Sequence, residues 1–128
     1  MDKKFIVAGA IFGAMSIVLG AFGAHALKEK LPATTLAVFE TGVKYQMYHA
    51  LFLLFAGIVS SISASAKNAI FWLATIGVIF FSGSIYLLSC QTLFGTDFKF
   101  LGPVTPIGGL LLIAAWIVLL LNILKVKR

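Results

Sequence analysis

Four long apolar segments, separated by short polar turns, make up nearly the whole chain. A hydrophobic segment of roughly 20 residues is long enough to cross a bilayer as a helix. The pattern therefore predicts an all-α protein, an integral membrane four-helix bundle in which residues 1–128 form a single membrane domain. The expected helices cover residues 5–27, 35–65, 69–91 and 106–124.

Small residues recur on one face of the first segment. Their spacings alternate between four and three residues, which is close to the 3.5-residue period of a helix-packing seam. Lipid gives apolar helices no hydrophobic reason to associate, so close backbone approach over small residues favours their packing. Gly57 and Ser61 share a face of the second segment, and we expect the first two helices to pack together. The seam of the first segment consists of Gly9, Gly13, Ser16, Gly20 and Gly23.

The second segment begins as an amphipathic helix and ends as an apolar one. Glu40, Lys44 and Tyr48 follow one another at intervals of four and form a polar stripe. A straight helix over residues 35–64 would be about 45 Å long, which exceeds a hydrocarbon core of about 30 Å. We therefore expect its first turns to lie in the interface, to tilt, or to bend near Gly42.

The first segment also has features of a secretory signal peptide. Two lysines precede it, and Ala24-His25-Ala26 matches a cleavage site. Its apolar run is nevertheless about a full membrane span, longer than the roughly 7–15 residues of a typical signal peptide core. We expect a retained helix.

Composition and charge agree with a membrane protein. Hydrophobic residues make up 61% of the chain and charged residues 11%, far from the balance of a soluble domain. The net charge of +6 comes from basic residues at segment ends, and not from a patch that could follow phosphates, so we expect no binding to nucleic acid. With four crossings, both termini share one side with most of the basic residues, which favours a cytoplasmic location for both. That side carries Lys3, Lys4, Lys67, Lys125, Lys127 and Arg128.

Few other residues carry obvious chemistry. Cys90 is the only cysteine, which rules out an intrachain disulfide and a multi-cysteine metal site. Ser82 and Ser84 are expected to donate hydrogen bonds between helices, and Gly108-Gly109 is expected to allow close packing. A convergent catalytic set cannot be assembled from such residues, so we do not expect an enzyme.

Four motifs together resemble a known family. They are Gly20-Ala-Phe-Gly-Ala-His-Ala-Leu27, Glu40-Thr-Gly-Val-Lys-Tyr-Gln-Met-Tyr-His-Ala-Leu51, Phe81-Ser-Gly-Ser-Ile-Tyr-Leu87 and Thr105-Pro-Ile-Gly-Gly109. In this order they resemble the YgdD/YwdK-like family of small bacterial inner-membrane proteins, which has eukaryotic relatives and is classed by a domain of unknown function. The resemblance implies a multi-pass protein of four helices in the bacterial inner (plasma) membrane. It implies no established activity and no role for any residue.

Five side chains form a candidate polar cluster at the expected non-cytoplasmic ends of the first two helices. Glu40 and Lys44 have the favoured order for a helical ion pair. Glu40 and His49 are nine residues apart, which places them on opposite faces of a helix and about 13 Å apart along it. His49 should instead share a face with Tyr45 and Phe52. The cluster consists of His25, Glu40, Lys44, Tyr48 and His49.

Two interpretations of this cluster are open. In the first, its pairings fix the register of the helices, and Lys44 extends toward water. In the second, the cluster handles a proton, an ion or a small solute, because histidine titrates near neutral pH and intramembrane ionisable residues often mark pathways. Metal or haem ligation by His25 and His49 lacks a supporting spacing, so we expect no metal and no cofactor.

The sequence thus predicts a small structural or accessory membrane protein that works through helix–helix association. The alternative is a small transporter or channel. The expected partners are membrane lipids and either further copies of the chain or another membrane protein.

Overall fold

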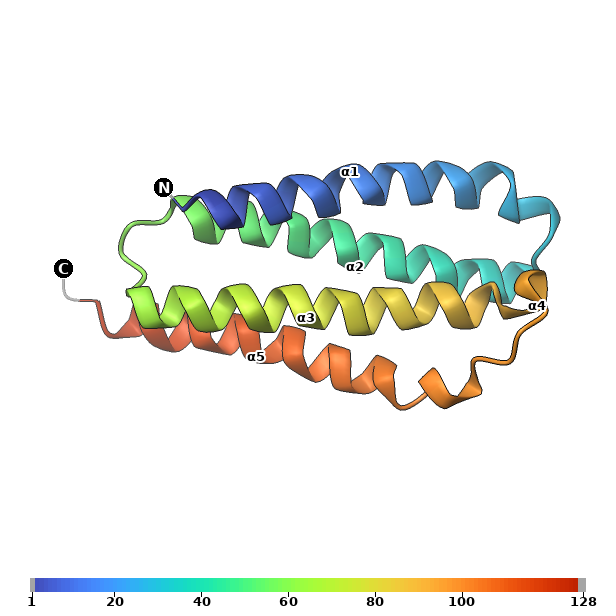
Figure 1. Ribbon diagram of the computed structural model, residues 1–128. Coiled ribbons are helices and arrows are strands. Elements are labelled where there is room, and N and C mark those ends of the chain that lie inside the picture. Colours follow the sequence, from blue (N-terminus) through green and yellow to red (C-terminus); the bar gives the residue numbers. More distant parts are fainter. Residues whose placement is uncertain (1, 127–128) are drawn as a thin grey trace.

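The structure, a computed structural model, describes residues 2–126, and four long helices account for most of them (Figure 1). These are α1 (Lys3–His25), α2 (Ala33–Ile58), α3 (Ala64–Ser89) and α5 (Val104–Leu124). Three short helical turns lie in the connections: η1 (Leu27–Glu29), α4 (Gln91–Phe94) and η2 (Lys99–Leu101). Residues 2–126 contain no strand, so the all-α prediction is confirmed.

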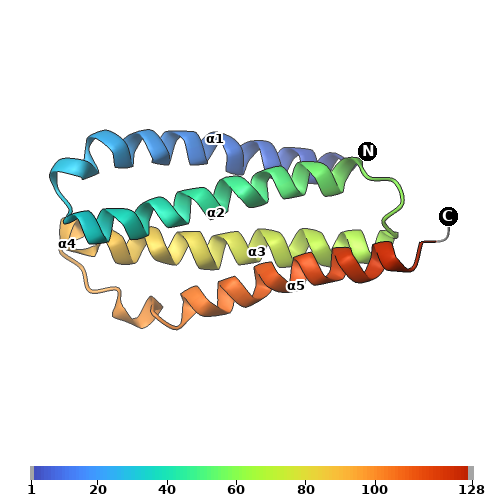
Figure 2. The same ribbon diagram turned by 180° about the vertical axis from the view of Figure 1, so that it is seen from behind.

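The four long helices pack in chain order and form two staggered layers. Helix α1 packs on α2, α2 on α3, and α3 on α5. In Figure 1, α1 and α3 lie in front of α2 and α5, and the view from behind in Figure 2 reverses this order. Side chains also join helices within a layer, since the rings of Phe5 and Phe71 are 5.3 Å apart and those of Phe52 and Trp116 are 4.3 Å apart. The first and last described residues lie at the same end of the molecule (Figure 1).

The helix boundaries differ from the predicted ones mainly between the second and third helices. Helix α2 ends at Ile58, and α3 already begins at Ala64. The reason is a cap: the Ser63 hydroxyl accepts a hydrogen bond from the Ala66 amide at 3.2 Å, which starts a new helix there. Ser61 therefore lies exposed in the turn, and not on the α2 face where the sequence predicted it.

The other boundaries move by a few residues. Helix α1 covers Lys3–His25 instead of residues 5–27, and α2 begins at Ala33 directly after Pro32 instead of at residue 35. Helix α5 begins at Val104, two residues before the predicted start. The Thr105 hydroxyl, in the first turn of α5, is hydrogen-bonded to that of Ser84.

Small residues mark the contact between α1 and α2. A Cβ atom added at Gly9 would lie 2.9 Å from the Ala50 carbonyl oxygen, and one at Gly57 would lie 2.6 Å from Cβ of Phe5. Neither contact leaves room for a larger residue without a shift of one helix. The remaining small residues of the α1 seam face α2 at longer distances or are buried: Gly13 faces Ala50, Gly20 faces Val43, Gly23 faces Phe39, and Ser16 is buried.

The contact between α3 and α5 is equally close. A Cβ atom at Gly108 would lie 2.8 Å from Cα of Phe81 and would overlap its backbone nitrogen. A Cβ atom at Gly77 would lie 2.7 Å from the Leu112 side chain. The close packing predicted at Gly108 is confirmed.

Two apolar clusters form the core, one toward each end. The larger one, at the end of the termini, joins all four long helices around Phe5, Leu53 and Ile70. The smaller one, at the opposite end, contains Leu27, Leu31, Phe39 and Cys90. Most of the buried polar side chains lie, along their helices, between members of the two clusters: Ser16, Gln46, His49, Ser82 and Ser84.

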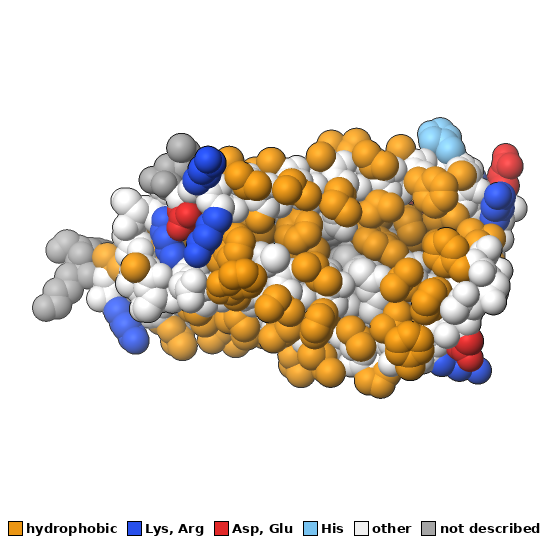
Figure 3. All heavy atoms as spheres, viewed as in Figure 1, with side chains coloured by type: hydrophobic (Ala, Val, Ile, Leu, Met, Phe, Trp, Pro, Cys, Tyr) orange, Lys and Arg blue, Asp and Glu red, His pale blue; other side chains and the backbone are white. Residues whose placement is uncertain are grey.

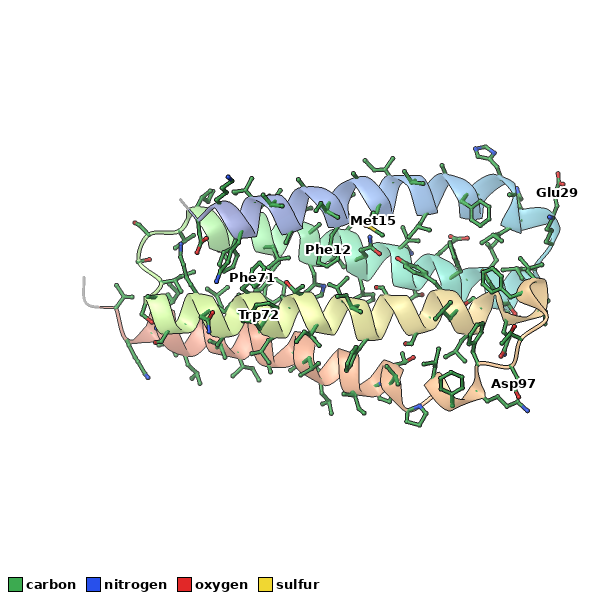
Figure 4. The ribbon with its side chains drawn as sticks, in the orientation of Figure 1. Phe12, Met15, Glu29, Phe71, Trp72 and Asp97 are labelled. Atoms are coloured by element: carbon green, nitrogen blue, oxygen red, sulfur yellow. The ribbon has the colours of Figure 1, made fainter. Side chains whose placement is uncertain are left out.

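Three helical segments of residues 2–126 are long and apolar enough to cross a membrane. They are Lys3–Glu29, Ala64–Ser89 and Lys99–Leu124, with mean hydropathies of 2.3, 1.9 and 2.6. Helix α2 is not among them, because Glu40, Lys44, Gln46 and His49 reduce its hydropathy, although it runs beside α1 and α3 along their length (Figure 1). On the face seen in Figure 3, hydrophobic side chains cover the middle and charged side chains gather at the two ends. Glu29 and Asp97 are both at the end opposite the termini (Figure 4).

Candidate functional site

The inward face of α2 carries the polar side chains that connect the bundle. We define this face as Gly42, Gln46 and His49, which follow one another at intervals of four and three residues and are all buried. The exposed fractions are only 2% for Gln46 and 4% for His49. Buried polar groups of this kind are costly unless they are hydrogen-bonded, so their partners define what the site can do.

Gln46 joins three helices. Its Nε2 atom donates to the Phe12 carbonyl oxygen of α1 at 2.9 Å, and its Oε1 atom accepts from the Tyr86 hydroxyl of α3 at 2.6 Å. The Phe12 carbonyl also accepts from the Ser16 hydroxyl at 2.8 Å. Phe12 itself lies between α1 and α3 near the middle of α1 (Figure 4). One amide side chain therefore ties α2 to both of its neighbours.

Serine hydroxyls make two further links. Ser82 donates to the Gly42 carbonyl oxygen of α2 at 2.7 Å, and Ser84 shares a hydrogen bond with Thr105 at the start of α5. Gly42 is needed for the first, because a Cβ atom there would lie 2.9 Å from the Ile85 side chain. The prediction that Ser82 and Ser84 form hydrogen bonds between helices is confirmed.

His49 uses both of its ring nitrogens. Trp116 Nε1, which can only donate, lies 3.0 Å from His49 Nε2, so Nε2 is the acceptor. The hydrogen-bond network therefore assigns the proton to Nδ1, which donates to the Tyr45 carbonyl oxygen at 2.7 Å. A neutral imidazole satisfies both contacts. The predicted face of Tyr45, His49 and Phe52 is present, with the His49 ring 6.5 Å from Tyr45 and 6.0 Å from Phe52.

The structure does not bring all residues of the candidate polar cluster together. His25, Glu40, Lys44 and Tyr48 are exposed, whereas His49 is buried on the inward face of α2. Glu40 and Lys44 line an open cavity of about 240 Å³ between α1 and α2. The other residues of this cavity are Gly20, Gly23, Ala24, Phe39 and Val43.

Gln46, Tyr86 and Trp116 were not singled out from the sequence as site residues. A signal for Gln46 was available, since it stands three residues before His49 and four after Gly42 on one helical face. No comparable signal connects Trp116 to His49, which is 67 residues away. Over residues 2–126, no group of three or more histidine, cysteine, aspartate or glutamate side chains is arranged to hold a metal ion.

The comparisons with known proteins find a family of membrane proteins that resembles this chain. The profile of the family described as "Protein of unknown function (DUF423)" matches residues 19–109, which include every residue of the inward face of α2. A UPF0382 membrane protein of Staphylococcus haemolyticus is 45% identical over 123 residues, covering 96% of this chain and 97% of that protein. The UPF0382 membrane protein YwdK of Bacillus subtilis is 41% identical over 125 residues, covering 96% and 98%.

No solved structure matches the chain. The family profile covers more than half of the chain, and the relatives cover nearly all of it at more than 40% identity. The resemblance inferred from the motifs is thereby confirmed. The chain belongs to the DUF423 family of UPF0382 membrane proteins.

Proposed function

We propose that the chain is a small structural or accessory protein of the bacterial inner membrane that acts through helix–helix association. The observation that carries this proposal is the satisfaction of the buried polar groups of α2. Gln46 bonds to α1 and α3, His49 to α5, and the Gly42 carbonyl to α3. Groups that are already paired with one another hold helices in register and leave little capacity to bind a polar cargo.

In this proposal α2 is the fourth membrane crossing. Its polar side chains lower its hydropathy, but the most buried of them face other helices and not lipid, which is how polar residues are tolerated within a membrane. Four crossings place both termini on one side. The basic residues Lys3, Lys4, Lys67 and Lys125 at that end favour the cytoplasm. Lipids and further membrane-embedded chains are the partners of such a protein.

The test compares two substitutions on α2 in purified, detergent-solubilised protein. Gln46→Leu removes the amide that joins three helices, whereas Tyr48→Leu changes an exposed residue on the same helix. The proposal expects Gln46→Leu to lower the melting temperature and the fraction of the protein that is in its native assembly. Tyr48→Leu should leave both quantities unchanged. If Gln46→Leu left stability and assembly unaltered, the association role would lose its basis.

A second candidate function, transport of a proton, an ion or a small solute, draws on the cavity beside Glu40 and Lys44. Two ionisable groups facing an open cavity of about 240 Å³ can serve a pathway. The test is a pH-sensitive dye inside proteoliposomes. A flux that Glu40→Gln abolishes while the protein stays folded would favour transport, and absence of flux in the unaltered protein would remove this candidate.

A further inference from the structure

A cavity of about 330 Å³ lies beside the hydrogen bond between His49 and Trp116. Its volume falls within the roughly 300–1,000 Å³ of small-molecule sites. Tyr45 and Trp116, which are 42% and 49% exposed, stand at its open side. The cavity is lined by Tyr45 and His49 of α2, Phe81 of α3, and Gly109, Leu112, Ile113 and Trp116 of α5.

The position of the cavity points to a lipid-soluble occupant. His49 is the seventeenth of the 26 residues of α2, and Trp116 is the thirteenth of the 21 residues of α5. Both are therefore near the middle of helices that run the length of the bundle. At that depth an opening on the outside of the bundle meets acyl chains and not water.

Aromatic rings form its walls and hold one another in place. The Tyr45 ring is stacked on His49 and meets Phe81 edge-on at 5.3 Å. The Trp116 ring meets His49 edge-on at 6.0 Å. Such preformed aromatic walls favour a flat ring, which can stack or make edge contacts, over a flexible acyl chain.

A hydrogen-bond donor and an acceptor stand together at the wall of the cavity. They are the Trp116 indole N–H and His49 Nε2, which are bonded to each other at 3.0 Å. A ligand carbonyl can accept from the indole N–H. A ligand hydroxyl that enters between the two rings can accept from Trp116 and donate to His49, which leaves neither group unpaired.

Two adjacent glycines of α5 differ in whether helix packing requires them. The comparison shows that the empty space of the cavity is not needed for α3 and α5 to pack. Gly108 is needed for packing, because a Cβ atom there would overlap the backbone of Phe81. A Cβ atom at Gly109 would meet only the Phe81 ring at 3.6 Å, an ordinary contact. Gly109 lines the cavity, so a side chain at this position would occupy space that helix packing leaves free.

From these observations we infer that the cavity binds a lipid-soluble ring that carries a carbonyl or hydroxyl oxygen, the chemistry of an isoprenoid quinone or its quinol. The ring lies between Tyr45, Phe81 and Trp116, and its apolar tail extends into the bilayer. A hydroxyl oxygen on the ring meets both Trp116 and His49, whereas a carbonyl oxygen accepts from Trp116 alone. This inference concerns binding, and of the pairings that support the association role proposed above it uses only the one between His49 and Trp116.

The experiment uses Trp116 as the reporter in the full chain. Trp72, the other tryptophan, lies toward the N-terminal end of α3 (Figure 4). The substitution Trp72→Phe removes its fluorescence. The protein is placed in phospholipid nanodiscs and titrated with a naphthoquinone that carries one prenyl unit, because quinones quench indole fluorescence on contact. We expect saturable quenching with one site per chain.

Matched glycine substitutions test the location. Gly109→Leu fills the cavity and should weaken binding by at least about tenfold, whereas Gly83→Leu, at a position with no atom within 4 Å of an added Cβ, should leave it unchanged. Ile113→Phe narrows the opening from an exposed position and provides the same test if Gly109→Leu fails to fold.

Three results would overturn the inference. The first is quenching that rises linearly with quinone in the bilayer and never saturates. The second is equal affinity in the cavity-filling variants and in Gly83→Leu. The third is displacement of the quinone by a saturated long-chain alcohol at equal concentration, which would make the cavity a groove for acyl chains.

Discussion

The interfaces within the bundle are of two kinds. Helices α1 and α2, and likewise α3 and α5, approach each other over glycines whose added Cβ atoms would meet the neighbouring helix. Between these two pairs, Gly42 also approaches α3 closely, but the contact depends in addition on hydrogen bonds across it. Tyr86 donates to Gln46, Ser82 donates to the Gly42 carbonyl oxygen, and Trp116 donates to His49. Close packing tolerates no added bulk, whereas hydrogen bonding tolerates changes of shape but not the loss of a partner. The two kinds of interface should therefore fail under different substitutions.

The largest effect is expected where a glycine faces a backbone. Gly108→Val places a branched side chain against the Phe81 backbone and should destabilise the α3–α5 contact by about 3 kcal/mol or prevent folding. The measurement is thermal unfolding in detergent followed by circular dichroism. Gly109→Ala is the control, and an equal loss in both variants would contradict a special role for Gly108.

A somewhat smaller effect is expected in the first helix pair. Gly9→Ala brings a methyl group to within 2.9 Å of the Ala50 carbonyl oxygen and of the Leu54 side chain, and Leu54 can move in part. We expect a loss of about 1–3 kcal/mol in the free energy of unfolding. Gly13→Ala, whose added atom would be 3.8 Å from Ala50, should lose little. If Gly13→Ala lowered the free energy of unfolding more than Gly9→Ala, α1 and α2 would not be packed in this register.

The contact between the pairs should respond to the loss of hydrogen-bond partners. Gln46→Leu leaves the Tyr86 hydroxyl without its acceptor and should cost about 1–2 kcal/mol. Tyr86→Phe in the same chain should restore part of that loss, because no buried hydroxyl is then left unpaired. A double-mutant cycle measures this coupling, and a value near zero would mean that the two side chains do not interact.

The smallest effect is expected at the outer edge of the contact between the pairs. Trp116→Phe keeps an aromatic ring beside Phe52 but removes the five-membered ring of the indole, with the N–H that donates to His49. A hydrogen bond between membrane helices contributes about 0.6 kcal/mol on average, so we expect a loss of that order. Chemical-shift changes of the His49 ring nitrogens in labelled protein would check that this bond is the one removed.

Local features of the fold followed from the sequence, and the partners of individual side chains did not. Apolar segment lengths predicted the long helices, and the small-residue spacing of the first segment anticipated which of its residues would face α2. The end of α2 was misplaced by seven residues, because Ser63 was not recognised as a cap within an otherwise apolar and small-residue stretch.

The candidate site shows the same limit. The motif that contains Glu40 and His49 was recognised, and helical geometry correctly separated the two residues. The hydrogen-bond partner of His49 on α5 is Trp116, which is 67 residues away in the sequence. Its identity depends on how α5 packs beside α2. Periodicity describes one helix at a time and cannot specify that contact.

The packing of the helices in chain order has a consequence for biosynthesis. Each long helix contacts the one that precedes it, so α1 needs only the first 58 residues to find its packing partner, and α3 needs only α5 to complete the second pair. Contacts between consecutive segments form quickly, because little chain entropy is lost in bringing them together. In the proposed topology of four crossings, the chain can therefore enter the bilayer as two successive hairpins. The costly polar face of α2 is exposed to lipid only until the second hairpin arrives to cover it.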